Sequence, residues 1–236
     1  MKGIILAGGT GTRLSPLTDV TNKHLLPVGR KPMILHLVSK LASAGITQIM
    51  IVTGTEHMGD MISLLGSGEK YGCDFTFKVQ EKASGIASAL KLCKNFTRDD
   101  KFVVLLGDNI FEDSLERYVE KYKTSLSPCH LFLKKVPDPH RYGVAVLRNG
   151  EIISAIEKPK NQISDMCITG IYMYDASVYE KIDSLKPSNR GEFEITEVNH
   201  MYIVEGNATF DILDGWWTDA GTFDSYKNAN VLADNV

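Results

Sequence analysis

A glycine-rich stretch that ends in an arginine, LAGGTGTRL, follows the first apolar run of the chain. Glycine has no Cβ atom, so the backbone N–H groups of Gly8, Gly9 and Gly11 can approach and surround an anion. Arg13 adds a permanent planar cation suited to phosphate oxygens, and Lys23 follows ten residues later. This combination predicts a loop that binds a polyphosphate. The alternative is a flexible glycine-rich turn.

The loop matches neither of the two common nucleotide-binding fingerprints. The P-loop pattern fails because Arg13 stands five residues after Gly8, and the dinucleotide pattern fails because Leu14 replaces its third glycine. A dinucleotide-binding oxidoreductase, which the glycines alone suggest, is therefore disfavoured.

Two acidic residues from distant parts of the sequence could hold a metal. Asp108 ends the apolar run VVLLGD, and Asp219 lies in WWTDAGT. Beside a polyphosphate loop, two such carboxylates suggest Mg²⁺, which usually takes one or two carboxylates together with phosphate oxygens. Taken singly, each is also typical of a solvated turn.

A third basic residue, Lys158, stands in the sequence EKP before Pro159. Proline stiffens the step that follows and could give Lys158 a defined direction, which would suit a second, phosphate-bearing substrate. The alternative is an ordinary surface lysine. No Gly-x-Ser-x-Gly motif occurs, so a covalent nucleophile is not indicated.

The first half of the chain alternates between apolar runs and amphipathic segments. Strands are expected at 2–7, 48–54, 74–80 and 101–108, and helices at 31–45, 57–68, 85–96 and 114–125. The helix at 31–45 places Met33, Ile34, Leu37, Val38 and Leu41 on one face. Such alternation predicts a parallel sheet covered by helices, with ligands at the carboxyl ends of its strands.

The second half changes character. Asn149-Gly150 between two apolar runs predicts a β-hairpin within 141–159. A strand and a helix are expected over 169–185, a helix over 192–206, a strand over 208–213, and a final helix. The predicted fold is α/β: a single Rossmann-like domain over 1–236, with a mostly parallel sheet flanked by helices and an antiparallel hairpin insertion in the second half.

Composition limits the partners and the compartment. The net charge is -3, so no global basic field attracts nucleic acid. The four cysteines are far apart and lack metal-site spacing, which favours reduced thiols in or near the core. No run approaches the ~18 apolar residues of a membrane helix, and the N-terminus lacks the features of a signal peptide. We therefore expect a cytoplasmic protein without membrane partners.

Several motifs occur together in a familiar order: KGIILAGGTGTRLSPLT, NKHLLPVGRKPMI, LGDNIF, IEKP, RGEFEIT and WTDAGT. In these the chain resembles the sugar-phosphate nucleotidylyltransferases, most closely the glucose-1-phosphate thymidylyltransferases, in a short form without the C-terminal helical extension of longer members. The resemblance implies an enzyme that converts dTTP and glucose 1-phosphate into dTDP-glucose and pyrophosphate, with Mg²⁺ as cofactor. It also implies a homo-oligomer, either a dimer or a tetramer.

The same resemblance implies roles for particular residues, with nucleotide binding in residues 1–125 and sugar-phosphate binding in 126–236. The implied nucleotide-binding residues are Leu6, Gly8, Gly9, Gly11, Thr12, Arg13, Gln80, Gly85 and Asp108. Those on the sugar-phosphate side are Asn109, Tyr142, Gly143, Glu157, Lys158, Gly170, Ile171, Arg190 and Trp217. The implied catalytic residues are Arg13, Lys23, Asp108, Lys158 and Asp219, and Asp108 and Asp219 would hold Mg²⁺.

Two alternatives stay open. Within the same chemistry, the enzyme could use UTP or another nucleotide, or another sugar 1-phosphate. In a different functional class, the chain could be a non-catalytic regulatory protein that binds a nucleotide sugar. A regulatory protein would have little reason to keep all five of the charged residues given catalytic roles, so their presence favours the enzyme.

Overall fold

The computed structural model describes residues 1–234, and contacts divide them into two units built from interleaved segments. The first unit comprises Met1–Ala83, Leu105–Glu120 and the chain from Asp214 onward, and the second comprises Ser84–Val104 and Lys121–Leu213. Each unit combines segments from both halves that the sequence suggests. The single domain with its two halves stays a prediction.

Three short parallel strands carry the first unit. They are β1 (Lys2–Ala7), β4 (Gln48–Thr53) and β5 (Asp74–Val79). The register places Ala7 opposite Thr53, and Thr53 opposite Val79. All but one residue of β1 and of β4 are buried, as expected for parallel strands covered on both faces. The loops that follow the three strands therefore open at one edge.

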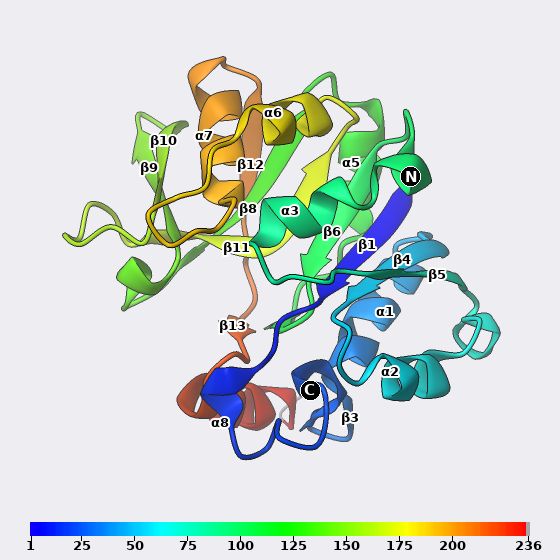
Figure 1. Ribbon diagram of the computed structural model, residues 1–236. Coiled ribbons are helices and arrows are strands. Elements are labelled where there is room, and N and C mark those ends of the chain that lie inside the picture. The colour runs from blue at the N-terminus through cyan, green and yellow to red at the C-terminus, as the bar shows by residue number, and fades with distance from the viewer. Residues whose placement is uncertain (235–236) are drawn as a thin grey trace. The chain divides into compact units, whose positions relative to one another are not determined.

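Helix α1 (Met33–Ser43) has the apolar face that its periodicity predicts. Met33, Ile34, Leu37, Val38 and Leu41 are all buried. The unit also contains α2 (Met58–Leu65) and α8 (Phe223–Ala233), and α8 packs against β2 (Pro27–Val28) and β13 (Trp217–Asp219) (Figure 1). Three short 3₁₀ helices (Thr12–Leu14, Lys23–Leu25 and Glu69–Tyr71) and β3 (Lys31–Pro32), which pairs with β2, complete it.

A short antiparallel pair joins two segments that are far apart in the sequence. Strand β7 (Asn109–Phe111) pairs with β13, so that Asn109 lies opposite Asp219 and Phe111 lies opposite Trp217. Buried Val28, Met33, Ile110, Ala220 and Ala229 form one apolar cluster around this pair and α8. The pairing thus brings the WTDAGT segment to the end of the GDN segment.

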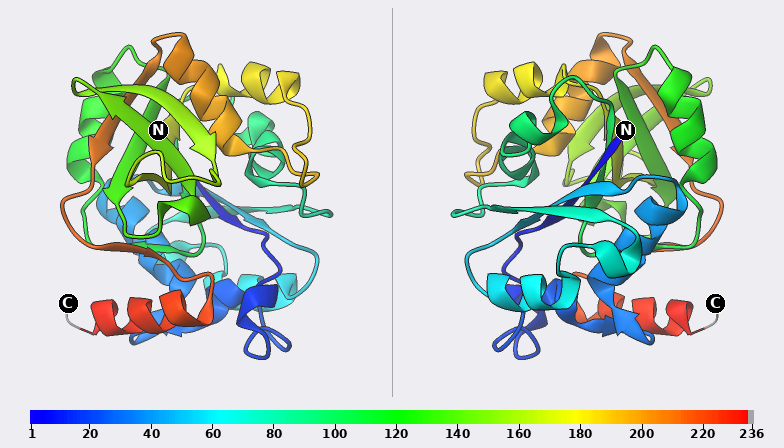
Figure 2. Two further views of the ribbon diagram at one scale, coloured as in Figure 1. Left: turned by 90° about the vertical axis from the view of Figure 1, so that its left-hand side faces the viewer. Right: turned by 90° about the vertical axis from the view of Figure 1, so that its right-hand side faces the viewer.

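The second unit is mainly antiparallel. Strands β9 (Gly143–Arg148) and β10 (Glu151–Glu157) form a hairpin, and β11 (Met166–Tyr174) pairs antiparallel with both β9 and β8 (Cys129–Lys135). Strand β12 (Ala208–Ile212) runs parallel to β8. Helix α7 (Ile195–Val204) packs beside β10 (Figure 2). The remaining elements are α3 (Ile86–Lys91), α4 (Lys94–Thr97), α6 (Val178–Ser184) and the 3₁₀ helix Pro139–Arg141.

The structure confirms the mixed α/β class, with parallel strands in the first unit and the hairpin at Asn149-Gly150 in the second. Strand β6 (Phe102–Leu106) and helix α5 (Glu116–Thr124) also form where they are expected. The helix expected over 85–96 is instead divided into α3 and α4. Between them Leu92 N donates to Ala89 O and Cys93 N donates to Leu90 O, which is the i→i−3 pattern of a 3₁₀ turn rather than that of an α-helix.

All four cysteines are free and buried, as predicted. None of the helices within residues 1–234 is both long enough and apolar enough to cross a membrane.

Candidate functional site

The glycine-rich loop after β1 faces two different side chains at successive positions. A Cβ atom on Gly8 would lie 2.8 Å from Gln80 Oε1, and one on Gly9 would lie 3.4 Å from Lys23 Nζ. Because neither residue has a Cβ, the backbone runs close against both groups. The loop is thus bordered by a carboxamide on one side and by a cation on the other.

Lys23 forms a short ion pair with Asp108. Its Nζ lies 2.6 Å from Asp108 Oδ2, and the two side chains are only 10% and 17% exposed. Asp108 Oδ1 also accepts a hydrogen bond from Asn109 Nδ2 at 3.0 Å. Burial alone would raise the pKa of the Asp108 carboxyl, but the Lys23 charge outweighs it and holds that pKa well below its usual range. Asp108 is therefore a carboxylate at every pH of interest.

A buried histidine, His24, lies beside the Lys23–Asp108 pair. His24 is 1% exposed. Both the backbone N and the ring Nδ1 of His24 donate hydrogen bonds to Asn22 Oδ1. Burial, together with the neighbouring Lys23 charge, lowers the pKa of His24 to about 3, so the ring is neutral. A Cβ atom on Gly107 would lie 2.5 Å from the His24 ring. The chain just before Asp108 is thus packed directly on a neutral imidazole.

The β7–β13 pair brings the second acid to the first. Ala220 N donates to Asp108 O at 2.7 Å, and Trp217 Nε1 donates to Asn109 Oδ1 at 2.8 Å. A Cβ atom on Gly221 would lie 3.3 Å from Arg13 Nη2, 3.4 Å from Asp108 Oδ2 and 3.6 Å from Asp219 Oδ2. One guanidinium and two carboxylates therefore converge on a single point. Within the described residues no group of three or more His, Cys, Asp or Glu side chains could hold a metal.

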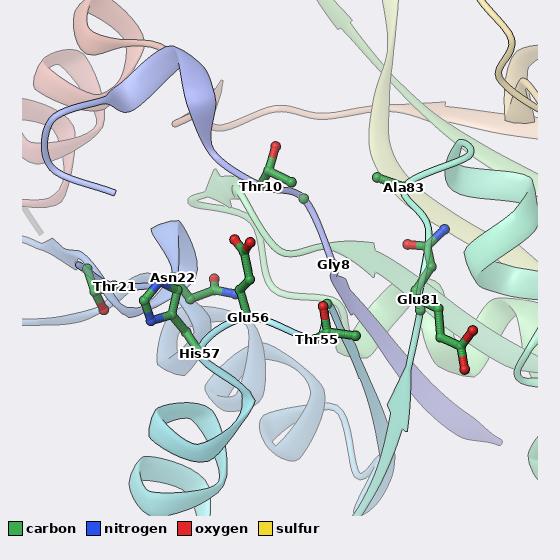
Figure 3. Close-up of a pocket in the computed structure, with 12 residues that line it drawn as sticks. Gly8, Thr10, Thr21, Asn22, Thr55, Glu56, His57, Glu81 and Ala83 are labelled. Carbon is green, nitrogen blue, oxygen red and sulfur yellow. The ribbon is translucent and has the colours of Figure 1, made fainter. Parts of the chain in front are cut away.

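A hollow of about 180 Å³ opens beside the glycine-rich loop. It is lined by the segments that follow β1, β4 and β5: Gly8, Gly9, Thr10, Gly54, Thr55, Glu56, His57, Gln80, Glu81 and Ala83, with Thr21 and Asn22 (Figure 3). Sequence reasoning missed Thr55, Glu56 and His57. They follow a parallel strand, and the rule that selected the other strand ends would have found them.

A second group of candidate residues lies in the second unit. Glu157, at the end of β10, accepts from Thr196 Oγ1 at 2.5 Å and from Arg190 Nη2 at 3.1 Å. Arg190 also binds the Glu194 carboxylate at 2.8 and 2.9 Å. Lys158 N donates to Tyr142 O at 2.9 Å, and Lys158 Nζ lies 3.6 Å from Glu157 Oε1. Arg190 Nη2 also lies 3.6 Å from Glu192 Oε2, so the unit holds two cations and three carboxylates together.

Lys158 has an unusual backbone. Its φ is 41°, in the region that favours glycine, although it carries a full side chain. Such strained residues persist only where the surrounding structure holds them, and they cluster at functional sites. The hydrogen bond from Lys158 N to Tyr142 O is one such restraint on the backbone at this lysine.

The remaining predicted residues occupy varied positions. Gly85 has φ 104°, and a Cβ there would lie 2.6 Å from Phe193 O. Gly143 packs on Thr196 Oγ1, while Gly170 and Ile171 lie where the pairing of β11 with β8 shifts, with the Ile171 side chain fully buried. Leu6 is buried in β1, and its carbonyl accepts a hydrogen bond from Gly107 N. Gly11, which is partly buried, and Thr12, which is exposed, lie at the start of a 3₁₀ helix.

Comparison with known proteins gives this arrangement a context. Residues 2–235 match the model of the nucleotidyl transferase family. The glucose-1-phosphate thymidylyltransferase of Neisseria meningitidis is 40% identical over 242 residues, which cover all of this chain and 83% of that protein. The low-salt glycan biosynthesis nucleotidyltransferase of Haloferax volcanii is 36% identical over 98% of this chain, which spans 66% of that relative's length.

Solved structures agree with the fold. A Bacillus anthracis protein assigned as a glucose-1-phosphate thymidylyltransferase, crystallised with sucrose, superposes with a TM-score of 0.96 at 55% identity, over all of this chain and 96% of that one. A UDP-glucose pyrophosphorylase complexed with UDP-glucose superposes with a TM-score of 0.87 over 99% of this chain and 98% of that one, and at 23% identity it supports the fold alone. From the family match and these relatives, the chain belongs to the nucleotidyl transferase family.

Proposed function

We propose that the protein transfers a thymidylyl group from dTTP to glucose 1-phosphate, giving dTDP-glucose and pyrophosphate. The observation that carries this proposal is the convergence of Arg13, Asp108 and Asp219 on one point beside the Lys23 ion pair. Such a cluster at strand ends, next to a glycine-rich loop, suits a nucleoside triphosphate. The named activities of the relatives support the same reaction class.

In the proposed reaction, a phosphate oxygen of glucose 1-phosphate attacks the α-phosphorus of the nucleotide in line, and pyrophosphate leaves with the electron pair of the broken bond. This chemistry needs positioning and charge neutralisation more than a protein nucleophile. The backbone from Gly8 to Thr12 would hold the phosphates, the Arg13 guanidinium would span two of their oxygens, and Lys23 would offset negative charge near the reacting centre.

The two carboxylates that face Gly221 fit a bound Mg²⁺, because this ion prefers oxygen ligands and is commonly held by one or two carboxylates plus phosphates. Asp108 and Asp219 would hold it. When bound, the ion would neutralise charge on the phosphates and orient them. Asp108 is already ionised beside Lys23, so no proton has to leave it before a cation binds.

The second unit would bind the sugar phosphate. The Glu157 carboxylate accepts hydrogen bonds from Thr196 and Arg190 and is suited to accept further ones from sugar hydroxyls. Lys158, whose Nζ lies 3.6 Å from Glu157 Oε1, would bind the phosphate. These assignments divide the substrates between the units, with the nucleotide on the first and the sugar phosphate on the second.

Gln80 would read the base. Its carboxamide, which borders Gly8, can both donate and accept, and so it can pair with the O4 and N3 edge that thymine and uracil share. These bases differ by one methyl group, which an apolar pocket distinguishes by only about 1–3 kcal/mol. UTP is therefore the close alternative, and the UDP-glucose pyrophosphorylase neighbour shows that this fold accommodates a uridine nucleotide in that protein.

A pyrophosphate-release assay tests the proposal, with dTTP, UTP, CTP, ATP and GTP crossed against several sugar 1-phosphates. We expect dTTP with glucose 1-phosphate to react fastest, UTP to be accepted, and the other three nucleotides to be poor substrates. Gln80→Ala should erode this ranking. Equal use of dTTP and GTP would refute base reading by Gln80, and no pyrophosphate release with any pair would refute the transferase.

A further inference from the structure

The two ends of the hollow in the first unit differ in chemistry, and this difference sets how a nucleotide would lie in it. At one end Gly8 faces the Gln80 carboxamide, and at the next residue Gly9 faces the Lys23 ammonium. A nucleotide bound with its base at Gln80 and its phosphates at Lys23 carries its pentose between these groups. The pentose then lies over the segment from Gly8 to Thr10, which lines the hollow.

Glu56 lines the same hollow from the loop between β4 and α2. In Figure 3 its side chain points toward the Gly8–Thr10 segment, whereas the Glu81 carboxylate points away from that segment. Within residues 1–234 the Glu56 carboxylate has no hydrogen bond or ion pair with another side chain or the backbone. It is therefore an acceptor on the wall of the hollow that the protein itself does not use.

Chemistry limits what such a carboxylate can bind. An ionised carboxylate only accepts hydrogen bonds, and it repels phosphate oxygens. The donors that a thymidine nucleotide offers are the N3–H of the base and the hydroxyl of its sugar. Since Gln80 already faces the base end, the sugar hydroxyl is the donor left for Glu56.

The residue after Glu56, His57, has a strained backbone conformation. His57 precedes the first turn of α2 with φ 58° and ψ 18°, which is left-handed backbone, and its Nδ1 lies 3.4 Å from Asp60 Oδ2. A non-glycine residue in this conformation is strained and persists only where its surroundings hold it. Strained residues of this kind cluster at functional sites, which is consistent with a turn that holds Glu56 at the hollow.

We propose that Glu56 is a specificity-determining residue that accepts a hydrogen bond from the pentose 3′-hydroxyl of the bound nucleotide. This inference rests on the proposed function and deepens it, because it names a contact to the nucleoside sugar. It also gives the nucleotide a fixed direction in the hollow, with carboxylate and carboxamide at the nucleoside end and cations at the phosphate end.

The test compares dTTP with 2′,3′-dideoxythymidine triphosphate, which differs from it only in the 3′-hydroxyl. Dissociation constants with Mg²⁺ are measured by titration calorimetry for the wild-type protein, Glu56→Ala and Glu56→Gln. Glu69→Gln removes an exposed carboxylate outside the hollow and serves as the matched control. The wild type and the control should bind dTTP about tenfold more tightly than the dideoxy form, as expected for one hydrogen bond to a charged group. Glu56→Ala should bind both alike, and Glu56→Gln should fall between.

Each other outcome has a defined meaning. Undiminished preference for dTTP in Glu56→Ala would overturn the assignment, and so would equal binding of both nucleotides by the wild type. If the wild type binds UTP but not dTTP, the base assignment fails while the inference is tested in the same way with UTP and 3′-deoxyuridine triphosphate. If none of the five nucleoside triphosphates binds, the proposed function itself fails, and the inference with it.

Discussion

At the scale of single residues, Arg13 is the test of how the phosphates are held. It is exposed, and its Nη2 lies beside the point on which Asp108 and Asp219 converge. A planar guanidinium can bind two phosphate oxygens at once, whereas an ammonium acts as a point charge. Arg13→Lys keeps the charge, so we expect kcat to fall about tenfold or more if the second contact is made in the transition state.

The measurement for Arg13→Lys is steady-state kinetics, with Arg30→Lys as an exposed control that should keep wild-type values. An unchanged kcat with only a higher KM for the nucleotide would mean that Arg13 binds the ground state and the transition state equally.

Asp108 is the second test at this scale. Asp108→Asn removes the charge that pairs with Lys23 and, in the proposed mechanism, a Mg²⁺ ligand, while the shape stays nearly the same. We expect turnover to be lost and the fold, followed by circular dichroism, to be retained. Asp99→Asn, at an exposed site, should leave turnover unchanged. Full activity of Asp108→Asn with a normal Mg²⁺ dependence would refute the metal assignment.

At the scale of elements, we expect a Gly→Ala substitution to have opposite effects on stability in the β9–β10 hairpin and in helix α2. Asn149 and Gly150 have φ values of 54° and 83°, both positive, as a type I′ turn requires. Gly150→Ala meets no atom within 4 Å, so its cost is backbone strain alone, about 1–2 kcal/mol. Gly59→Ala, inside α2 and equally open, should instead stabilise by about 0.5–1 kcal/mol.

Urea unfolding of the two variants measures both effects in one experiment. The backbone argument for the hairpin turn is supported if Gly150→Ala lowers the urea concentration at the unfolding midpoint while Gly59→Ala raises it. A stabilising Gly150→Ala would contradict the backbone argument.

Elements with a strong local pattern could be predicted from the sequence. The buried face of α1 follows from its periodicity, and the Asn149-Gly150 turn from its backbone preference. The β7–β13 pair could not be predicted, because each strand has only three residues and residues 112–216 separate them. Only that pairing shows how Asp219 reaches Asp108. The division of the 85–96 helix and the left-handed backbone of Lys158 also depend on surrounding contacts rather than on local sequence.

The candidate site was therefore predictable in its residues more than in its geometry. The glycine-rich loop, Arg13, Lys23 and the acids stand out by type and by their place after strands. His24 does not, since nothing in TNKHLLP indicates that this histidine will be buried beside the Lys23–Asp108 pair.

At the scale of the whole molecule, buried histidines should govern stability in mild acid. Burial lowers the pKa of His24 to about 3 and that of His130 to about 4, and it also lowers the pKa of His36. In the unfolded chain each titrates near the ordinary value of about 6.5. Below that pH the unfolded chain takes up protons that the folded protein does not, so the free energy of unfolding falls as the pH drops.

For His24 this loss begins as the pH falls through about 6.5 and continues down to about 3, and it contributes nothing well above 6.5. Between pH 7.5 and pH 5.5, one such group removes about 1.4 kcal/mol of stability. His24→Gln has no imidazole to protonate in either state, so its free energy of unfolding should fall by about 1.4 kcal/mol less than that of the wild type over this interval. Urea unfolding at the two pH values measures the difference, and His140→Gln, at an exposed site, should follow the wild type. If His24→Gln and His140→Gln lose equal stability between pH 7.5 and 5.5, His24 is not held neutral in the folded protein, and the packing of Gly107 on an uncharged ring beneath Asp108 must be revised.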